Sequence, residues 1–110
     1  MFSSALKKGS VGMLLLSLLD GEPLHGYEIG KRIESRSGGR LVFRVSSLYP
    51  VLCRLEDRGL IKGRWVEKRG QRRRRFYRLT AAGRGALATE RKTWQEYQLA
   101  VNLVMEPSHA

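Results

Sequence analysis

The sequence predicts a mainly α-helical domain with one small β-hairpin, in the pattern of a winged helix-turn-helix. Three observations predict this fold class. Three helical segments with recognisable ends fill the first half, two short β-like runs then flank a glycine turn, and a long helical segment follows. Because the chain has 110 residues, the usual length of one domain, we expect a single compact unit.

The first two helices are recognised by the signals that end them. Residues 5–19 are rich in leucine, contain no proline and stop at Asp20-Gly21, with Pro23 close behind. Apolar residues almost encircle this segment, so we expect the helix to be buried on most sides. The second helix is expected from about His25 to Arg36, where Ser37-Gly38-Gly39 breaks it.

A third helix is expected after a short extended stretch at residues 41–45. Ser46 and Ser47 are both good N-cap residues, and either start places Pro50 in the first turn, where a missing N–H costs little. Gly59 then ends the helix as a left-handed C-cap. The core stripe, at helical spacing, consists of Leu48, Leu52 and Leu55.

The second half predicts a hairpin and a long final helix. Ile61 to Glu67 and Phe76 to Leu79 have the composition of strands joined around Gly70. Thr80 caps the last helix, which runs to about Met105. The order therefore predicts a winged helix-turn-helix at residues 1–79 and a C-terminal helix at residues 80–110 in the same compact unit.

The charge of the chain points to a polyanionic partner. Lysine and arginine number 21 against 10 acids, a formal net charge of +11, and nine of the basic residues lie between Lys62 and Arg78 with only Glu67 among them. Such a field attracts nucleic acid or an anionic membrane surface. We favour nucleic acid, because a membrane-surface role would need a basic amphipathic helix and here the basic density lies in a hairpin.

Other classes of function have less support. We find no nucleophile–base pair, carboxylate pair or phosphate loop for an enzyme, and the two histidines and one cysteine are too scattered for a metal site or cofactor. Cys53, expected to be an inert thiol, leaves no disulfide and favours a cytoplasmic setting. Lys7, Lys8 and the apolar run after them imitate a signal peptide, but no cleavage site follows and the run is too short to span a membrane.

The N-terminus of the third helix is the expected DNA-reading element, where free backbone N–H groups and the helix dipole favour phosphate. Tyr49 can donate its hydroxyl to a phosphate, and Arg54 can reach the backbone or a guanine edge. The alternatives are a half-buried packing role for Tyr49 and a solvated Arg54. His25, grouped with Tyr27 as a candidate contact, could equally be a buried hydrogen-bonding histidine. The helix start itself presents Ser47, Tyr49 and Pro50.

The arginine run Arg72 to Arg75 gives the stronger prediction. Alternation along a strand places Arg73 and Arg75 on one face and Arg72 and Arg74 on the other. With arginines on both faces, we expect the hairpin tip to pack against the body on neither side. It can instead lie along a phosphate backbone or enter a minor groove. At least two of these four arginines should contact DNA.

These residues together resemble a known family. Residues 23–29 read PLHGYEI and residues 47–50 read SLYP, and Trp65, the arginine run, Phe76-Tyr77, Leu79-Thr80 with Gly83, and Trp94 follow in order. From about residue 13 to residue 101 the sequence resembles the PadR family of transcriptional regulators, in the short form with one C-terminal helix. The resemblance implies dimeric regulators that usually repress transcription, some with planar aromatic effectors between subunits. It also implies DNA contacts at Ser47, Tyr49, Pro50 and the arginines Arg72 to Arg75 of the hairpin, which is the wing of this fold. Ser46 departs from the glycine common there.

The last helix carries an apolar seam with heptad spacing. Its members are Leu87, Trp94, Tyr97, Val101 and Val104. We expect these residues and the first helix to hold a homodimer, with Trp94 packing in the seam and also available to stack on an effector. The predicted function is a sequence-specific homodimeric repressor on a palindromic operator, with a planar aromatic molecule as candidate effector. The alternative is a sequence-indifferent nucleic-acid-coating protein.

Overall fold

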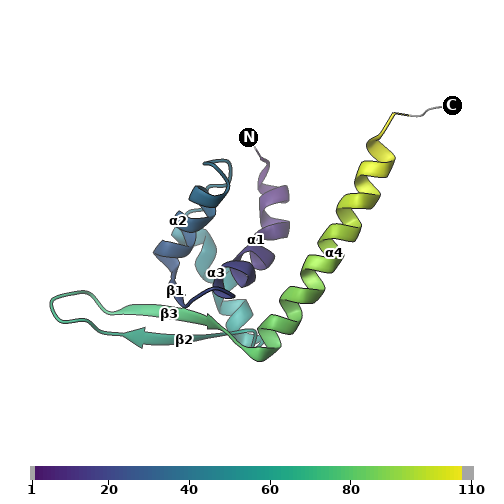
Figure 1. Ribbon diagram of the computed structural model, residues 1–110. Coiled ribbons are helices and arrows are strands. Elements are labelled where there is room, and N and C mark those ends of the chain that lie inside the picture. The colour runs from purple at the N-terminus through teal and green to yellow at the C-terminus, as the bar shows by residue number, and fades with distance from the viewer. Residues whose placement is uncertain (1, 108–110) are drawn as a thin grey trace.

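The structure, a computed structural model, describes residues 2–107 (Figure 1). Its elements are α1 (Ser4–Leu19), β1 (Leu24–His25), α2 (Gly26–Arg36), α3 (Val45–Asp57), β2 (Ile61–Val66), β3 (Arg74–Leu79) and α4 (Ala81–Met105). The predicted order of three helices, a hairpin and a long helix is confirmed. The two-residue strand β1 is an addition, because so short a strand has no periodicity to reveal it.

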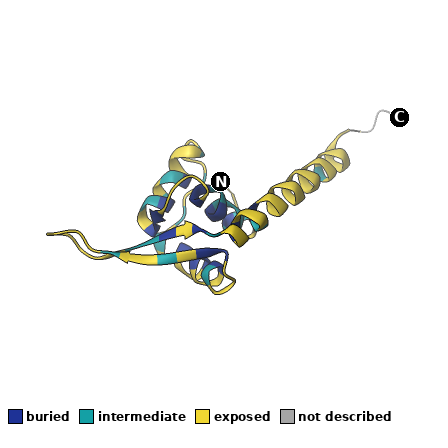
Figure 2. Cartoon of the chain, turned by 60° about the horizontal axis from the view of Figure 1, so that its bottom comes forward, coloured by how far each residue is buried: buried dark blue, intermediate teal, exposed yellow. Residues whose placement is uncertain are grey.

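The core forms where α1, α2 and α3 meet one face of the sheet. Figure 2 shows buried residues gathered at this junction, whereas the hairpin tip and most of α4 are exposed. The predicted stripe on α3 is confirmed, since Leu48, Leu52 and Leu55 are 0%, 0% and 4% exposed. Burial of α1 is confirmed only for its second half, from Val11 to Leu19, because the first turns extend beyond the bundle.

The start of α3 differs from the prediction. The helix begins at Val45, its N-cap is Arg44, and no side chain caps it, so neither Ser46 nor Ser47 has that role. The first turn closes on the Arg44 carbonyl, which accepts from the N–H groups of Ser47 and Leu48. Pro50 is therefore the sixth helical residue, in the second turn. Residues 41–44 pair with no strand, because Phe43 packs against the core instead.

The sheet is antiparallel with strand order β1-β3-β2. In its register Ile61 lies opposite Leu79, Lys62 opposite Arg78, and Arg64 opposite Phe76. Alternation sends Leu24, Ile61, Tyr77 and Leu79 toward the helices, where all four are buried. The opposite face carries His25, Phe76 and Arg78, with Lys62 and Arg64 beside them. This second face is cationic.

Two predicted caps fix where α3 ends and α4 begins. Gly59 has φ +74°, and the N–H of Leu60 donates to the Leu55 carbonyl at 3.0 Å, as expected for a left-handed C-cap. The Thr80 hydroxyl accepts from the N–H of Gly83 at 3.0 Å and donates to the Gly59 carbonyl at 2.7 Å. Position 83 requires glycine, because a Cβ there would collide with the Leu60 carbonyl.

Beyond its first turns, α4 leaves the body of the domain (Figure 1). Only Gly83 and Leu87 are buried among its 25 residues. Leu87 was expected in a dimer seam, but at 2% exposure it belongs to the core of its own chain and offers a second copy almost no surface. No helix within residues 2–107 has the length and apolarity needed to cross a membrane.

Candidate nucleic-acid interface

The outer surface of α3 has two flanks with different surroundings. Tyr49 lies on the flank that faces α2: its ring is 3.6 Å from the position that a Cβ on Gly26 would take. The tyrosine is nevertheless 47% exposed, so it packs at the start of α2 and still presents surface to a ligand. Ser47, Pro50 and Arg54 are exposed on the flank that faces α1.

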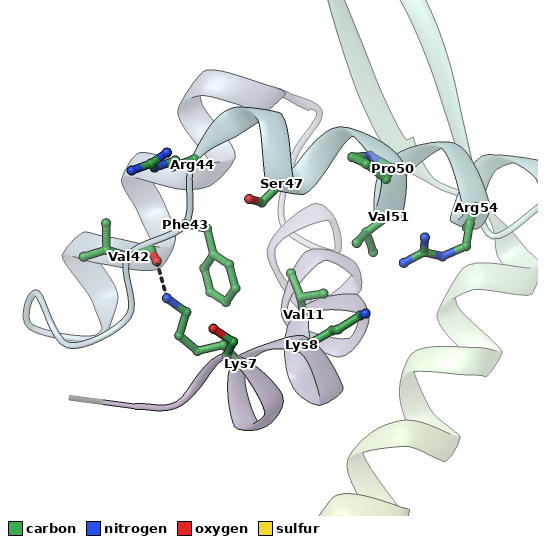
Figure 3. Close-up of a pocket in the computed structure, with 11 residues that line it drawn as sticks. Lys7, Lys8, Val11, Val42, Phe43, Arg44, Ser47, Pro50, Val51 and Arg54 are labelled. Atoms are coloured by element: carbon green, nitrogen blue, oxygen red, sulfur yellow. Dashed lines mark hydrogen bonds between the residues drawn. The ribbon is translucent and has the colours of Figure 1, made fainter.

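Beside that second flank lies an open hollow of about 710 Å³ (Figure 3). The N-terminal half of α1, residues 42–44 and α3 line it, and its apolar wall includes Val11, Phe43 and Val51. Lys8 from α1 and Arg54 from α3 point into the same end of the hollow. No carboxylate residue lines it, so it forms a cationic border along α3.

Two lysines from α1 join this surface although they are far from α3 in sequence. Lys7 Nζ donates to the Val42 carbonyl at 3.2 Å and lies 5.4 Å from the centre of the Phe43 ring. Lys8 is exposed. In the sequence this pair only precedes an apolar run and gives no sign of a place on the interface. The packing of α1 on α3, which no local pattern encodes, brings these lysines beside the candidate reading helix.

The hairpin face that looks toward α3 is fixed to that helix by Arg75. Its Nη2 donates to Glu56 Oε2 at 2.7 Å, and the same oxygen accepts from the N–H of Gly63 at 3.0 Å. The guanidinium crosses so close over Gly63 that a Cβ there would collide with it. Both members of the ion pair are mostly buried, with side chains 27% and 29% exposed.

Farther out on the same face, Arg73 stacks on Trp65. The guanidinium carbon lies 4.3 Å from the centre of the indole ring, and a distant contact of 3.9 Å joins Arg73 to Glu67. Trp65 is 51% exposed, and Arg73 is exposed as well. The stacking holds the Arg73 guanidinium against the indole ring. Trp65 was missed as a site residue, because only the strand register places it under Arg73.

On the opposite face of the sheet, His25 is enclosed by protein groups. Its Nδ1 accepts from the N–H of Glu28 at 3.4 Å as the cap of α2, and its Nε2 lies 2.7 Å from Glu28 Oε1. Arg74 Nη1 lies 2.9 Å from the same Nε2, and Phe76 packs edge-on against the ring. Burial lowers the pKa of His25 although Glu28 opposes the shift.

These contacts correct two expectations. His25 is 5% exposed, so it is the buried hydrogen-bonding histidine rather than an open phosphate contact. The expectation that the wing arginines pack on neither side is wrong for Arg74 and Arg75, because partners distant in sequence, His25 and Glu56, hold them on opposite faces. Arg72 is exposed near the tip.

Two other candidate residues form no hydrogen bond in this network, although the Tyr27 ring stacks on His25 with the ring centres 6.4 Å apart. Tyr27 is 56% exposed on α2, with Lys31 Nζ 4.7 Å from the centre of its ring. Cys53 is an exposed free thiol on α3. Within the described part of the chain, no group of histidine, cysteine and carboxylate side chains is arranged to hold a metal ion.

The fold and this surface define a winged helix-turn-helix protein with an exposed reading helix and a basic wing. The transcriptional regulator PadR-like family matches residues 15–89, so the chain belongs to this family of transcriptional regulators.

Solved structures share the fold. A transcriptional regulator from Clostridium thermocellum is 30% identical, with a TM-score of 0.87 covering 96% of this chain and 100% of that one. A PadR family transcriptional regulator from Eggerthella lenta is also 30% identical, with a TM-score of 0.84 covering 94% and 88%. Bacillus subtilis PadR in complex with operator DNA is 24% identical, and the superposition has a TM-score of 0.64. It covers 84% of this chain and 57% of that one, and shows a shared fold.

Curated relatives carry no assigned activity. Uncharacterized protein X of Lysinibacillus sphaericus is 28% identical over 106 residues, which are 96% of this chain and 97% of that protein. An uncharacterized 37.1 kDa protein in a Streptomyces fradiae transposon is 42% identical over 85 residues. That match covers 77% of this chain but only 23% of the larger protein.

Proposed function

We propose that this PadR-like regulator is a cytoplasmic homodimer that binds a palindromic DNA operator and represses transcription. The observation that carries the proposal is the position of α3: its exposed surface lies between two cationic regions. Lys7, Lys8 and Arg54 border one flank, and the stacked Arg73 and exposed Arg72 project along the wing on the other. A helix in the major groove and a basic wing on the adjacent backbone would use this arrangement.

The fold of a relative supports the same reading. Bacillus subtilis PadR, whose structure contains operator DNA, shares this winged fold. In this chain the groups best placed for base or phosphate contact are Ser47, Tyr49, Pro50 and Arg54 on α3, because all four are exposed. Arg74 and Arg75 act differently in the proposal, since their protein partners make them supports of the wing.

The exposed length of α4 supports a homodimer. Tyr97, Leu103 and Val104 are 64%, 63% and 85% exposed, and Trp94 is 45% exposed. A helix so apolar is unfavourable in water unless a partner covers it, and the heptad spacing of Trp94, Val101 and their neighbours suits a second copy of the helix. Phe2, which precedes α1, and Leu6 in its first turn add exposed apolar surface beside Trp94 and Tyr97.

An aromatic effector has a candidate place beside this seam. An open hollow of about 610 Å³ lies between α1 and α4, with Leu6, Met13 and Leu14 on one wall and Trp94 and Tyr97 on the other. A planar ligand could stack on the indole and shift α4, which would change the spacing of the two α3 helices. Because two half-sites lie about 34 Å apart on DNA, a small rotation would weaken binding.

Selection of binding sites from random duplexes tests the proposal. We expect a recovered palindrome whose half-sites are separated by about one helical turn, 10 to 10.5 base pairs, or a multiple of it. Recovery of unrelated sequences with similar affinity would instead favour a protein that coats nucleic acid without regard to sequence.

A further inference from the structure

The face of the sheet that points away from α3 carries a cluster of four cations, and the nearest carboxylate on that face, Glu28, is paired with His25. Lys62 and Arg78 lie directly opposite each other on β2 and β3, and Arg64 is the next residue on that face of β2. Together with Lys68, these cations surround a shallow hollow of about 400 Å³ over Phe76 and Pro23. Among residues 2–107, no ion pair joins any of the four to a carboxylate.

The pairing of Lys62 with Arg78 is unfavourable for the fold. Like charges directly opposite each other on neighbouring strands destabilise a sheet, and both side chains are exposed without a partner that would relieve the repulsion. The core-facing neighbours in the same register, Ile61 and Leu79, already fix the strands. Neutral residues at positions 62 and 78 would therefore stabilise the pairing of β2 and β3 better than these two cations do.

This surface cannot share a duplex with α3. Ile61, Tyr77 and Leu79 are buried on the face packed against the helices, so the strand register places Lys62, Arg64 and Arg78 on the opposite face. Trp65, Arg73 and Arg75 extend along the helix-facing side of the wing, beside the DNA bound by α3 in the proposed function. Duplex DNA is stiff over about 150 base pairs, so one segment does not bend round to the opposite face of a single sheet.

We propose that Lys62, Arg64, Lys68 and Arg78 form a second DNA-binding surface, which holds the phosphate backbone of another duplex segment while α3 holds the first. Recognition there is electrostatic and indifferent to sequence, because the residues are lysines and arginines on a sheet face and no helix enters a groove. A regulator with this surface bridges two segments of DNA. The proposal goes beyond operator recognition and uses different residues.

The test uses full-length protein on an immobilised operator duplex obtained by selection. Because a palindrome occupies both α3 helices of a dimer, a labelled random-sequence duplex added afterwards reports the second surface. Wild-type protein is expected to capture the labelled duplex, and capture should fall steeply with salt. Retention on the operator without capture of the second duplex would overturn this proposal, whereas failure to bind any operator would overturn the proposed function.

Lys62→Glu is the decisive variant. It places a carboxylate opposite Arg78, so it should replace a repulsive pair with an attractive one and leave Tm unchanged or raised. Capture of the second duplex should fall by about tenfold, because one phosphate contact is lost and the new carboxylate repels the backbone. Operator affinity should match that of Lys92→Glu, an equal charge reversal on exposed α4.

Three results would contradict the proposal. One is unchanged capture by Lys62→Glu. Another is an equal loss of capture in Lys92→Glu, which would make the effect one of net charge alone. The third is competition by poly-L-glutamate as effective as competition by duplex DNA at equal charge concentration, which would favour an acidic protein as the partner.

Discussion

The close contact between Gly63 on β2 and the Arg75 side chain on β3 gives a sharp prediction. In Gly63→Ala, the new Cβ would collide with the Arg75 guanidinium, so that side chain must leave its position. Its 2.7 Å bond to Glu56 would then be lost. A hydrogen bond to a charged group contributes about 1.5 to 3 kcal/mol. Alanine also lowers the backbone entropy of the unfolded chain, which stabilises the folded state by about 0.4 to 1 kcal/mol.

The expected result is a net destabilisation of about 1 to 2 kcal/mol, which lowers Tm by roughly 4 to 9 °C for a domain of this size. Thermal denaturation at fixed protein concentration measures it. Gly85→Ala is the matched control, because a Cβ there meets no atom within 4 Å, and helix propensity should make it slightly stabilising.

A double-mutant cycle separates this explanation from a general intolerance of bulk. In a Glu56→Gln background the charged acceptor is already absent, so Gly63→Ala should cost clearly less than in the wild type. Equal costs in both backgrounds would refute the role given to the Arg75–Glu56 pair, as would a Gly63→Ala protein more stable than the wild type.

Four further predictions concern acid stability, salt, the dimer and the effector. The pKa of His25 is lower in the folded chain than its ordinary value of 6.5, because burial disfavours the charged ring. Tm should therefore fall as the pH drops from 6.5 through the lower folded pKa, since the unfolded chain binds the proton more readily. A His25→Gln variant should lack this part of the pH dependence of Tm. The logarithm of operator affinity should fall with the logarithm of salt concentration with a slope on the order of −7, flatter by about one unit per lost contact in Arg73→Ala and in Arg72→Ala, and an unchanged slope would mean that the wing does not touch DNA. Truncation after Glu90 keeps the buried Leu87 and Gly83, so sedimentation should find folded monomer or aggregate, and a persistent dimer would exclude the α4 seam. Planar aromatic ligands should quench tryptophan fluorescence in wild-type protein and in Trp65→Phe but not in Trp94→Ala, and the reverse pattern would place the ligand at the wing.

Local signals account for most of the predicted fold. Gly59 and Thr80 mark the end of α3 and the start of α4 through capping chemistry that depends on a few neighbouring residues, and both predictions are confirmed. The start of α3 was missed because no side chain caps it: Phe43 packs against the core and the helix begins two residues later, one residue before Ser46. β1 was missed because its two residues form a strand only through pairing with β3.

The candidate site was less predictable, because its arginines differ in partners that lie far along the chain. Four consecutive arginines look equivalent in sequence, yet Arg75 is bound to Glu56, 19 residues away, and Arg74 contacts His25, 49 residues away. Lys8 reaches α3 only through the packing of α1. Strand alternation correctly predicts that Arg74 and Arg75 occupy opposite faces, but it does not identify what each face meets.

The affinity ratio between the selected operator and a random duplex, measured at one salt concentration, tests the central claim most directly. If α3 reads bases from two half-sites of a dimer, the operator should bind about a thousandfold more tightly or better. A ratio near one would contradict the account and leave only an electrostatic attraction to DNA.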